Sequence, residues 1–184
     1  MISSPRLLLR PFSLADAPKV FAMGDEQGIR RWIPDQVYRD QQHAEQVVRA
    51  LIAHTDNPPA PAARPYVLGI EHKETRVLIG HVGLSPARGS VEIGYAVEQR
   101  LHGNGFATEA VTAMATWASA ELSLPEVLGI VEADNVASCR VLEKAGFVRH
   151  RDEVKHVGGR ATTIVIYRYA PDDVAHFSTT GARR

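Results

Sequence analysis

The chain has 184 residues, of which 45% are hydrophobic, and it carries 21 Lys+Arg against 21 Asp+Glu. This apolar content is enough for a folded core, and the zero formal net charge argues against general binding to nucleic acid or to an anionic membrane. Its one cysteine, Cys139, excludes an internal disulfide, and no apolar run reaches the roughly 20 residues of a transmembrane helix. We therefore expect one domain over residues 1–170, a tail over 171–184 and a cytoplasmic location.

The first half of the chain is expected to supply one strand, two helices and an antiparallel meander. The run RLLLRPF predicts a strand over 6–12, and Asp16 is a candidate N-cap for a helix that has Pro18 in its first turn. Residues 40–54 carry apolar side chains at helical spacing. Three β-rich runs with short breaks between them then predict antiparallel neighbours: 66–72, 77–85 and 90–97.

The second half alternates between helix and strand. A helix over 106–121, a strand over 127–132 and a helix over 136–145 follow in order, the last capped by Asn135 and ended by Gly146. This order implies a parallel strand pair with a right-handed crossover. We predict a mixed α/β sheet of about seven strands with four main helices, antiparallel at first and locally parallel later. Its last two strands, 147–154 and 161–169, flank a turn at 158–159.

The segment VEQRLHGNGFAT, residues 97–108, joins a predicted strand to a predicted helix. Gly103 and Gly105 permit positive φ and let backbone N–H groups approach an anion, and the following helix directs its unpaired N–H groups to the same place. A phosphate or pyrophosphate is the natural ligand; the alternative is a glycine turn without one. Thr108 departs from the dinucleotide-binding pattern G-x-G-x-x-G/A, and no Gly-Lys-Ser/Thr of a P-loop occurs.

Arg100, Gly103 and Gly105 instead match the pattern Gln/Arg-x-x-Gly-x-Gly/Ala. Together with the blocks RLLLRPF, EIGYAVEQRLHGNGFATEAV and NVASCRVLEKAGF, the chain resembles the GNAT superfamily of acyl-CoA-dependent N-acetyltransferases. The nearest branch looks like the RimJ/RimL type, which acetylates α-amino groups of ribosomal proteins. The resemblance covers roughly residues 5–170. It implies a GNAT fold in which the parallel strands 92–97 and 127–132 splay apart, with acetyl-CoA as the cosubstrate.

The resemblance also implies which residues contact acetyl-CoA. Asn135 and Ser138 match positions that contact the far end of the pantetheine arm and the thiol. Arg140 and Lys144 could meet the nucleotide phosphates, or form an ordinary solvated helix face. The remaining expected contacts are the backbone at Ala96 and Val97 along the arm, the motif residue Arg100, and at the pyrophosphate the amides of His102, Gly103, Asn104, Gly105, Phe106, Ala107 and Thr108.

The implied reaction is attack of a neutral amine on the thioester, which needs a base because the acceptor must first lose a proton. Glu92 is the first candidate, with a structural carboxylate as its alternative, and Glu132 and Glu153 are weaker candidates. The acid in many relatives is a tyrosine at the position where this chain has Leu142. Ser138 is the only hydroxyl in that predicted helix that could substitute, which makes Glu92 and Ser138 the expected catalytic pair.

The acceptor is left open. A protein N-terminal α-amine is one candidate, a small molecule such as an aminoglycoside, a polyamine or an amino acid is another, and a non-catalytic CoA-binding sensor is the competing class. Trp32 either walls an acceptor pocket or anchors a loop to the core. His150 and His156 match no metal-site spacing, so no metal is expected. The last strands could leave an edge for pairing in a homodimer.

Overall fold

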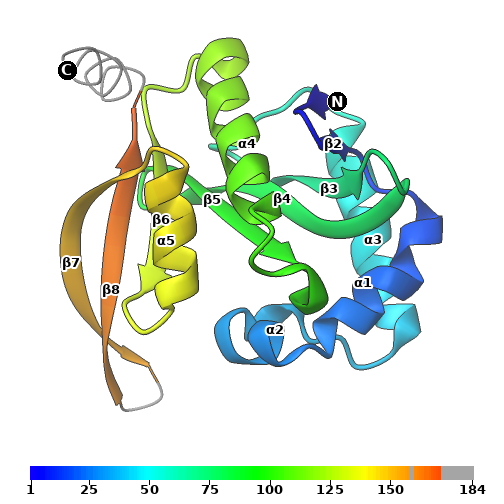
Figure 1. Cartoon of the computed structure of the whole chain (residues 1–184), viewed down its shortest axis with the longest axis horizontal. Coiled ribbons are helices and arrows are strands. Elements are labelled where there is room, and N and C mark those ends of the chain that lie inside the picture. The colour runs from blue at the N-terminus through cyan, green and yellow to red at the C-terminus, as the bar shows by residue number, and fades with distance from the viewer. Residues whose placement is uncertain (158–159, 171–184) are drawn as a thin grey trace.

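The computed structural model describes residues 1–157 and 160–170, so the predicted turn at 158–159 and the tail over 171–184 lie outside the described residues. The described residues form an eight-stranded sheet in the order β1-β2-β3-β4-β5-β6-β8-β7 (Figure 1). Neighbouring strands are antiparallel except for β5 and β6, which are parallel. The predicted mixed sheet is confirmed, with eight strands in place of about seven.

Nearly every predicted element is present, and two were missed. The missed elements are β1 and α2, which are too short to show a hydrophobic period, so the described residues form five α-helices in place of the expected four. The strands are β1 (Ile2–Ser3), β2 (Leu7–Arg10), β3 (Tyr66–His72), β4 (Val77–Ala87), β5 (Ser90–Val97), β6 (Val127–Glu132), β7 (Val148–Val157) and β8 (Arg160–Tyr169). The helices are α1 (Ala17–Gly24), α2 (Gln27–Trp32), α3 (Gln41–Thr55), α4 (Phe106–Leu122) and α5 (Val136–Lys144).

N-cap residues mark where α1, α3 and α5 begin, and in α3 and α5 the cap side chain accepts a helix amide. A short 3₁₀ turn precedes α1, so Asp16 is the N-cap and Pro18 falls in the first turn, as predicted. The Asp40 carboxylate accepts the amide of the third residue of α3, and the Asn135 side chain does the same for α5. Gly146, at φ +88°, follows the end of α5 in the left-handed conformation that stops a helix.

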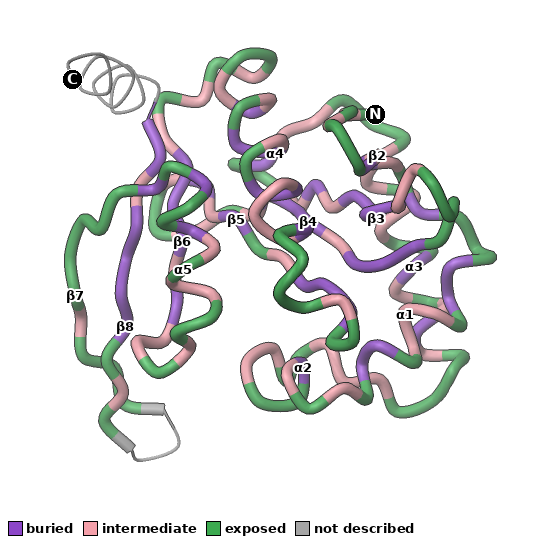
Figure 2. Tube along the Cα trace, viewed as in Figure 1, coloured by how far each residue is buried: buried purple, intermediate pink, exposed green. Residues whose placement is uncertain are grey.

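The helices cover both faces of the sheet. The larger core joins α4 and α5 to one face, with Met114 and Leu142 fully buried against strand residues such as Leu84. A smaller core joins α1 and α3 to the other face around Phe12 and Val48. Buried segments concentrate in the central strands, while the outer strand β7 is largely exposed (Figure 2). Burial of the apolar stripes on both sides therefore holds the central strands in place.

The sheet opens between β5 and β6. In the described part of the chain their only paired residues are Glu92 and Leu128, although both strands run on beyond that point. Figure 1 shows β6, β8 and β7 diverging from the rest of the sheet. The splay predicted for this parallel pair is thus present, and it leaves one edge of β5 without a neighbouring strand.

A tight turn lies at the closed end of the opening, where β5 and β6 are still paired. The β4–β5 hairpin turns through Arg88 (φ +53°) and Gly89 (φ +78°), and Arg88 Nη1 lies 2.5 Å from Glu153 Oε2 on β7. Positive φ at both turn residues gives the twist that suits a two-residue hairpin. This ion pair joins the two halves of the sheet near Glu92.

Candidate active site

A cleft of about 700 Å³ occupies the opening between β5 and β6. This volume lies within the range of small-molecule and cofactor sites, about 300–1,000 Å³. All but two of the predicted site residues line it. They are Glu92, Ala96, Val97, His102, Gly103, Gly105, Phe106, Ala107, Thr108, Asn135 and Ser138.

Arg100 and Asn104 are the two that do not line the cleft, and their roles as cofactor contacts stay predictions. Arg100 is mostly exposed, and its Nε lies 2.8 Å from Glu98 Oε1, a carboxylate that Lys19 also binds. The Asn104 side chain donates to the carbonyl of Leu101 at 3.0 Å and so stabilises the loop from within. Neighbouring carboxylate and carbonyl groups therefore engage both side chains outside the cleft.

The loop before α4 exposes backbone amides to the cleft. Gly103 and Gly105 have φ of +81° and +80°, and a Cβ on Gly103 would meet no atom within 4 Å. Gly105 is the N-cap and has no side chain, and the first bond of the helix runs from Glu109 N to Gly105 O at 3.0 Å. The amides of residues 106–108 precede that bond, at the positive end of the helix dipole. This arrangement suits a phosphate.

Arg6 anchors this loop from the start of β2. Its Nε lies 2.7 Å from Glu109 Oε2, its own backbone N donates to Glu109 Oε1 at 2.7 Å, and its Nη1 donates to Asn104 O at 3.0 Å. The guanidinium also lies 4.5 Å from the centroid of the Phe106 ring. Sequence reasoning missed this role because the partners lie about a hundred residues away, although RLLLRPF drew notice as a motif.

The three candidate bases differ in whether they line the cleft. Glu92 lines the cleft, where burial raises the pKa of its carboxyl, partly offset by the positive charges of Lys155 and Arg88. Glu132, at the end of β6, also lines the cleft. Glu153 does not line it: its carboxylate pairs with Arg88, and that contact lowers its pKa. Two of the three candidate carboxyls, Glu92 and Glu132, thus line the cleft.

Ser138 lies in the first turn of α5 with a partner that sequence reasoning missed. The hydroxyl oxygen of Tyr95 lies 2.7 Å from Ser138 Oγ, and the tyrosine donates to Ser138 O at 3.1 Å. Burial raises the pKa of Tyr95 to about 12. Strand alternation, which turns Tyr95 to the face opposite Glu92, is the signal that could have found it, because a buried phenol needs a hydrogen-bond partner.

The segment around α2 forms a further wall of the cleft. Trp32 lines the cleft, with the Arg31 guanidinium 4.4 Å from the centroid of its ring. Glu26 also lines it, and its Oε2 accepts the amide of Gln99 at 2.8 Å, which ties this wall to the loop before α4. Of the two interpretations of Trp32, the structure supports a wall of the cleft.

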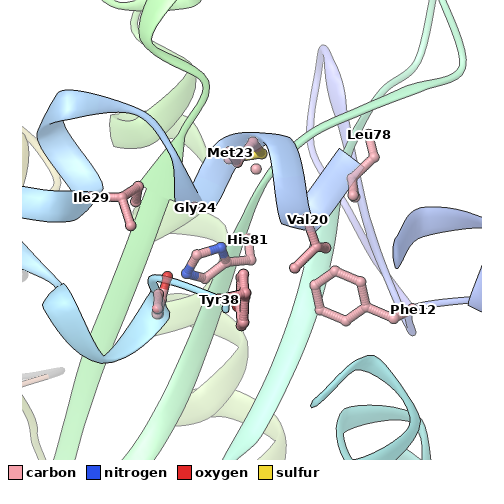
Figure 3. Close-up of a pocket in the computed structure, with 10 residues that line it drawn as sticks. Phe12, Val20, Met23, Gly24, Ile29, Tyr38, Leu78 and His81 are labelled. Atoms are coloured by element: carbon pink, nitrogen blue, oxygen red, sulfur yellow. The ribbon is translucent and has the colours of Figure 1, made fainter. Parts of the chain in front are cut away.

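A second, small cavity lies behind this wall (Figure 3). It measures about 20 Å³ and is bordered by His81 of β4 and Tyr38, while Ile29 and Gln36 line both this cavity and the cleft. Burial lowers the pKa of His81 to about 4, so its imidazole is neutral at pH 7. The cavity is about large enough for one water molecule. Among residues 1–157 and 160–170, no group of three or more His, Cys, Asp and Glu is placed to hold a metal ion.

Residues 6–148 match the family model described as "Acetyltransferase (GNAT) domain". The chain belongs to the GNAT acetyltransferase family. This GNAT protein is accordingly an acetyl-CoA-dependent N-acetyltransferase, and the resemblance seen in its sequence is confirmed. No helix in the described ranges combines the length and apolar character needed to cross a membrane.

Known proteins similar to this GNAT acetyltransferase differ in their acceptors. The uncharacterized N-acetyltransferase YoaA of Bacillus subtilis is 28% identical over 150 residues, which cover 80% of this chain and 82% of YoaA. The spermidine N-acetyltransferase of Vibrio cholerae, solved with CoA and spermine, has a TM-score of 0.75 at 19% identity and covers 94% of this chain and 99% of its own. RimL, a ribosomal L7/L12 α-N-protein acetyltransferase solved with coenzyme A, has a TM-score of 0.74 at 16% identity, with 92% and 97% covered. At these identities the two structures show the shared fold alone.

Proposed function

We propose that acetyl-CoA binds in the cleft with its pyrophosphate on the amides of residues 102–108, and that its acetyl group passes directly to a primary amine in a ternary complex. The observation that carries this proposal is the uncapped start of α4, where two left-handed glycines leave backbone amides facing a large cleft. These donors fit a diphosphate in geometry and in sign of charge.

The edge of β5 supports this placement of the pantetheine arm. Past Glu92, no strand among the described residues pairs with this edge, so an extended chain bearing amides can pair with it as a strand would. The carbonyl of Val97 already lies 2.8 Å from His102 Nε2, so that group is engaged by the loop. Arg140 and Lys144 of α5 line the same cleft, where their charges suit the phosphates of the nucleotide.

Glu92 is the proposed base and Ser138 the proposed donor to the sulfur. A carboxyl with a raised pKa holds a proton more readily than an ordinary glutamate, which favours its taking a proton from the acceptor amine. Ser138 lines the cleft on the opposite side of β5 from Glu92 and keeps its proton for hydrogen bonding. The amine then attacks the carbonyl carbon, and the thiol leaves.

The acceptor we propose is a protein N-terminal α-amine. Its ordinary pKa of about 7.7–8.0 makes it easier to deprotonate than a lysine side chain at about 10.4. A cationic small molecule such as a polyamine is the second candidate, because Glu26, Glu92 and Glu132 all line the cleft. The likeness to RimL and to the spermidine enzyme supports one candidate each.

Release of thiol from acetyl-CoA, measured across a panel of acceptors, tests the proposal. The panel holds peptides with varied free N-termini, lysine peptides with blocked N-termini, polyamines and aminoglycosides. We expect turnover with the free N-terminal peptides. Turnover with polyamines alone would transfer the assignment to the second candidate, and acetyl-CoA binding with no turnover on any acceptor would favour a sensor and overturn the proposal.

A further inference from the structure

Two hydroxyl groups bridge β5 and α5 across one side of the cleft. The Tyr95 hydroxyl oxygen lies 2.7 Å from Ser138 Oγ and 3.1 Å from the Ser138 carbonyl oxygen. The amide of Ser138 donates to Asn135 Oδ1 at 3.2 Å. The serine is therefore held twice, through its backbone by the helix cap and through its side chain by the tyrosine.

The single phenol proton can be placed in two ways. If Tyr95 donates it to the Ser138 carbonyl, the serine hydroxyl must donate to the tyrosine oxygen. If Tyr95 donates it to Ser138 Oγ, the serine proton is free to point at a third group in the cleft. The two arrangements interconvert by rotation of two O–H bonds, with no movement of heavier atoms. The pair can therefore turn the serine proton toward a new hydrogen-bond acceptor as soon as one forms in the cleft.

We propose that Tyr95 is a positioning residue that makes the Ser138 hydroxyl a hydrogen-bond donor to the sulfur that leaves during acetyl transfer. The inference rests on the proposed function. Glu92 has by then taken one proton from the acceptor amine. As the neutral amine nitrogen bonds to the carbonyl carbon, the C–S bond breaks, its electron pair stays on sulfur, and the second proton that the nitrogen loses passes to solvent. Ser138 donates to this thiolate while Tyr95 donates to Ser138 Oγ. The serine keeps its proton, and the released coenzyme A takes its proton from solvent.

The surroundings of Tyr95 suit this role better than that of a proton-transfer acid. Its raised pKa of about 12, caused mainly by burial, keeps the phenol neutral and protonated at neutral pH. Consecutive O–H groups polarise one another, so the hydrogen bond from Tyr95 strengthens the one that Ser138 donates. Leu142, where many relatives have a tyrosine acid, is 1% exposed and packs in the core. The tyrosine hydroxyl of this chain therefore comes from β5 and not from α5, and it acts through Ser138.

A titration of bound coenzyme A tests the pair without any acceptor. The ultraviolet absorbance of the thiolate is followed against pH, and each curve is corrected with the same variant free of coenzyme A. In the wild-type protein we expect the bound thiol to have a lower pKa than free coenzyme A. Tyr95→Phe and Ser138→Ala should each remove most of this lowering, and the double variant should remove no more than Ser138→Ala. An unchanged titration in Tyr95→Phe would overturn the proposal.

Kinetics separate positioning from a merely structural bond. Tyr95→Phe should lower kcat about tenfold while the KM for acetyl-CoA changes by no more than about twofold. The matched control is Tyr169→Phe, which removes a part-buried hydroxyl 3.4 Å from Thr116 Oγ1 and should leave kcat unchanged. Equal effects of the two variants on kcat would refute the role of Tyr95. Since the titration needs no turnover, a failure of the acetyl-transfer assignment itself stays distinguishable.

Discussion

Arg6 is predicted to set the affinity for acetyl-CoA without contacting it. Arg6→Ala removes the side-chain bonds to Glu109 and to the Asn104 carbonyl, and it removes the stacking over Phe106. Glu109 keeps the backbone amide of Arg6 and the hydroxyl of Ser4 as donors, so no buried charge is left without a partner. The substitution therefore loosens the loop and leaves the fold in place.

The magnitude follows from the exposure of the contacts. The Arg6 side chain is 46% exposed, so its ion pair contributes at most about 1 kcal/mol to stability, and the cation–π contact adds about 0.5–1 kcal/mol. Freeing one residue of the loop adds about 1–2 kcal/mol of ordering cost to binding. We therefore expect the Kd for coenzyme A to rise about tenfold, since each 1.4 kcal/mol corresponds to that factor.

Calorimetric titration with coenzyme A measures this change, and kcat at saturating acetyl-CoA should be unaltered because Arg6 touches no reacting atom. Arg49→Ala is the matched control: it breaks another arginine–carboxylate pair, 2.6 Å long, between Arg49 and Glu45 on the distant helix α3. An Arg6→Ala protein that binds coenzyme A as tightly as Arg49→Ala does would refute the reasoning.

Three further predictions concern titration and backbone geometry. Burial raises the pKa of Glu92 above that of the unfolded chain, so its carboxyl favours folding below the ordinary glutamate pKa and loses that contribution as pH rises through the raised value. Glu92→Gln should thus raise Tm at pH 8 more than at pH 4, and it should lower kcat/KM about 100-fold or more at pH 6–9; a Tm gain that does not depend on pH, or unchanged turnover, contradicts this. The pKa of His81, lowered to about 4, means that the contribution of His81 to stability is full above about pH 6.5 and falls by up to about 1.4 kcal/mol per pH unit below it. Urea unfolding at pH 7 and 5 should show that loss reduced in His81→Gln, and equal losses in both proteins would exclude His81 as its source. Gly105→Ala, at φ +80°, should cost about 1–2 kcal/mol in thermal unfolding, whereas Gly28→Ala, in a helix with no atom within 4 Å of the new Cβ, should be neutral or stabilising.

The sequence was sufficient for the longer elements and for the loop before α4, because both depend on local chemistry, whereas the short β1 and α2 were missed. Hydrophobic periods and caps such as Asp40 and Asn135 act over three or four residues, and they placed α3, α4 and α5 within one residue of their observed ends. The pattern of Gly103 and Gly105 likewise reports a backbone requirement that only glycine meets at low cost. These features can be recognised from the local sequence before any tertiary contact is known.

The contacts that complete the site could not be predicted from the sequence, because they join residues far apart in the chain. Tyr95 reaches Ser138 across 43 positions, and Arg6 reaches Glu109 across 103. Neither spacing corresponds to a period of helix or strand. Arg100 shows the converse: it matched the motif, yet the nearby Glu98 carboxylate engages it outside the cleft.

The divergence of β5 and β6 also bears on how the protein avoids aggregation. A strand edge with free N–H and C=O groups is a template for pairing with another chain, and proteins usually blunt such edges with charge, bulges or closure. Here the divergence creates two such edges in the middle of the sheet, and they face each other across the cleft. A broad β-sheet from another protein would meet the walls formed by α2 and α5 before it reached either edge, whereas a slender extended molecule would not. The opening that admits a ligand therefore also screens the free N–H and C=O groups of β5 and β6 from other proteins.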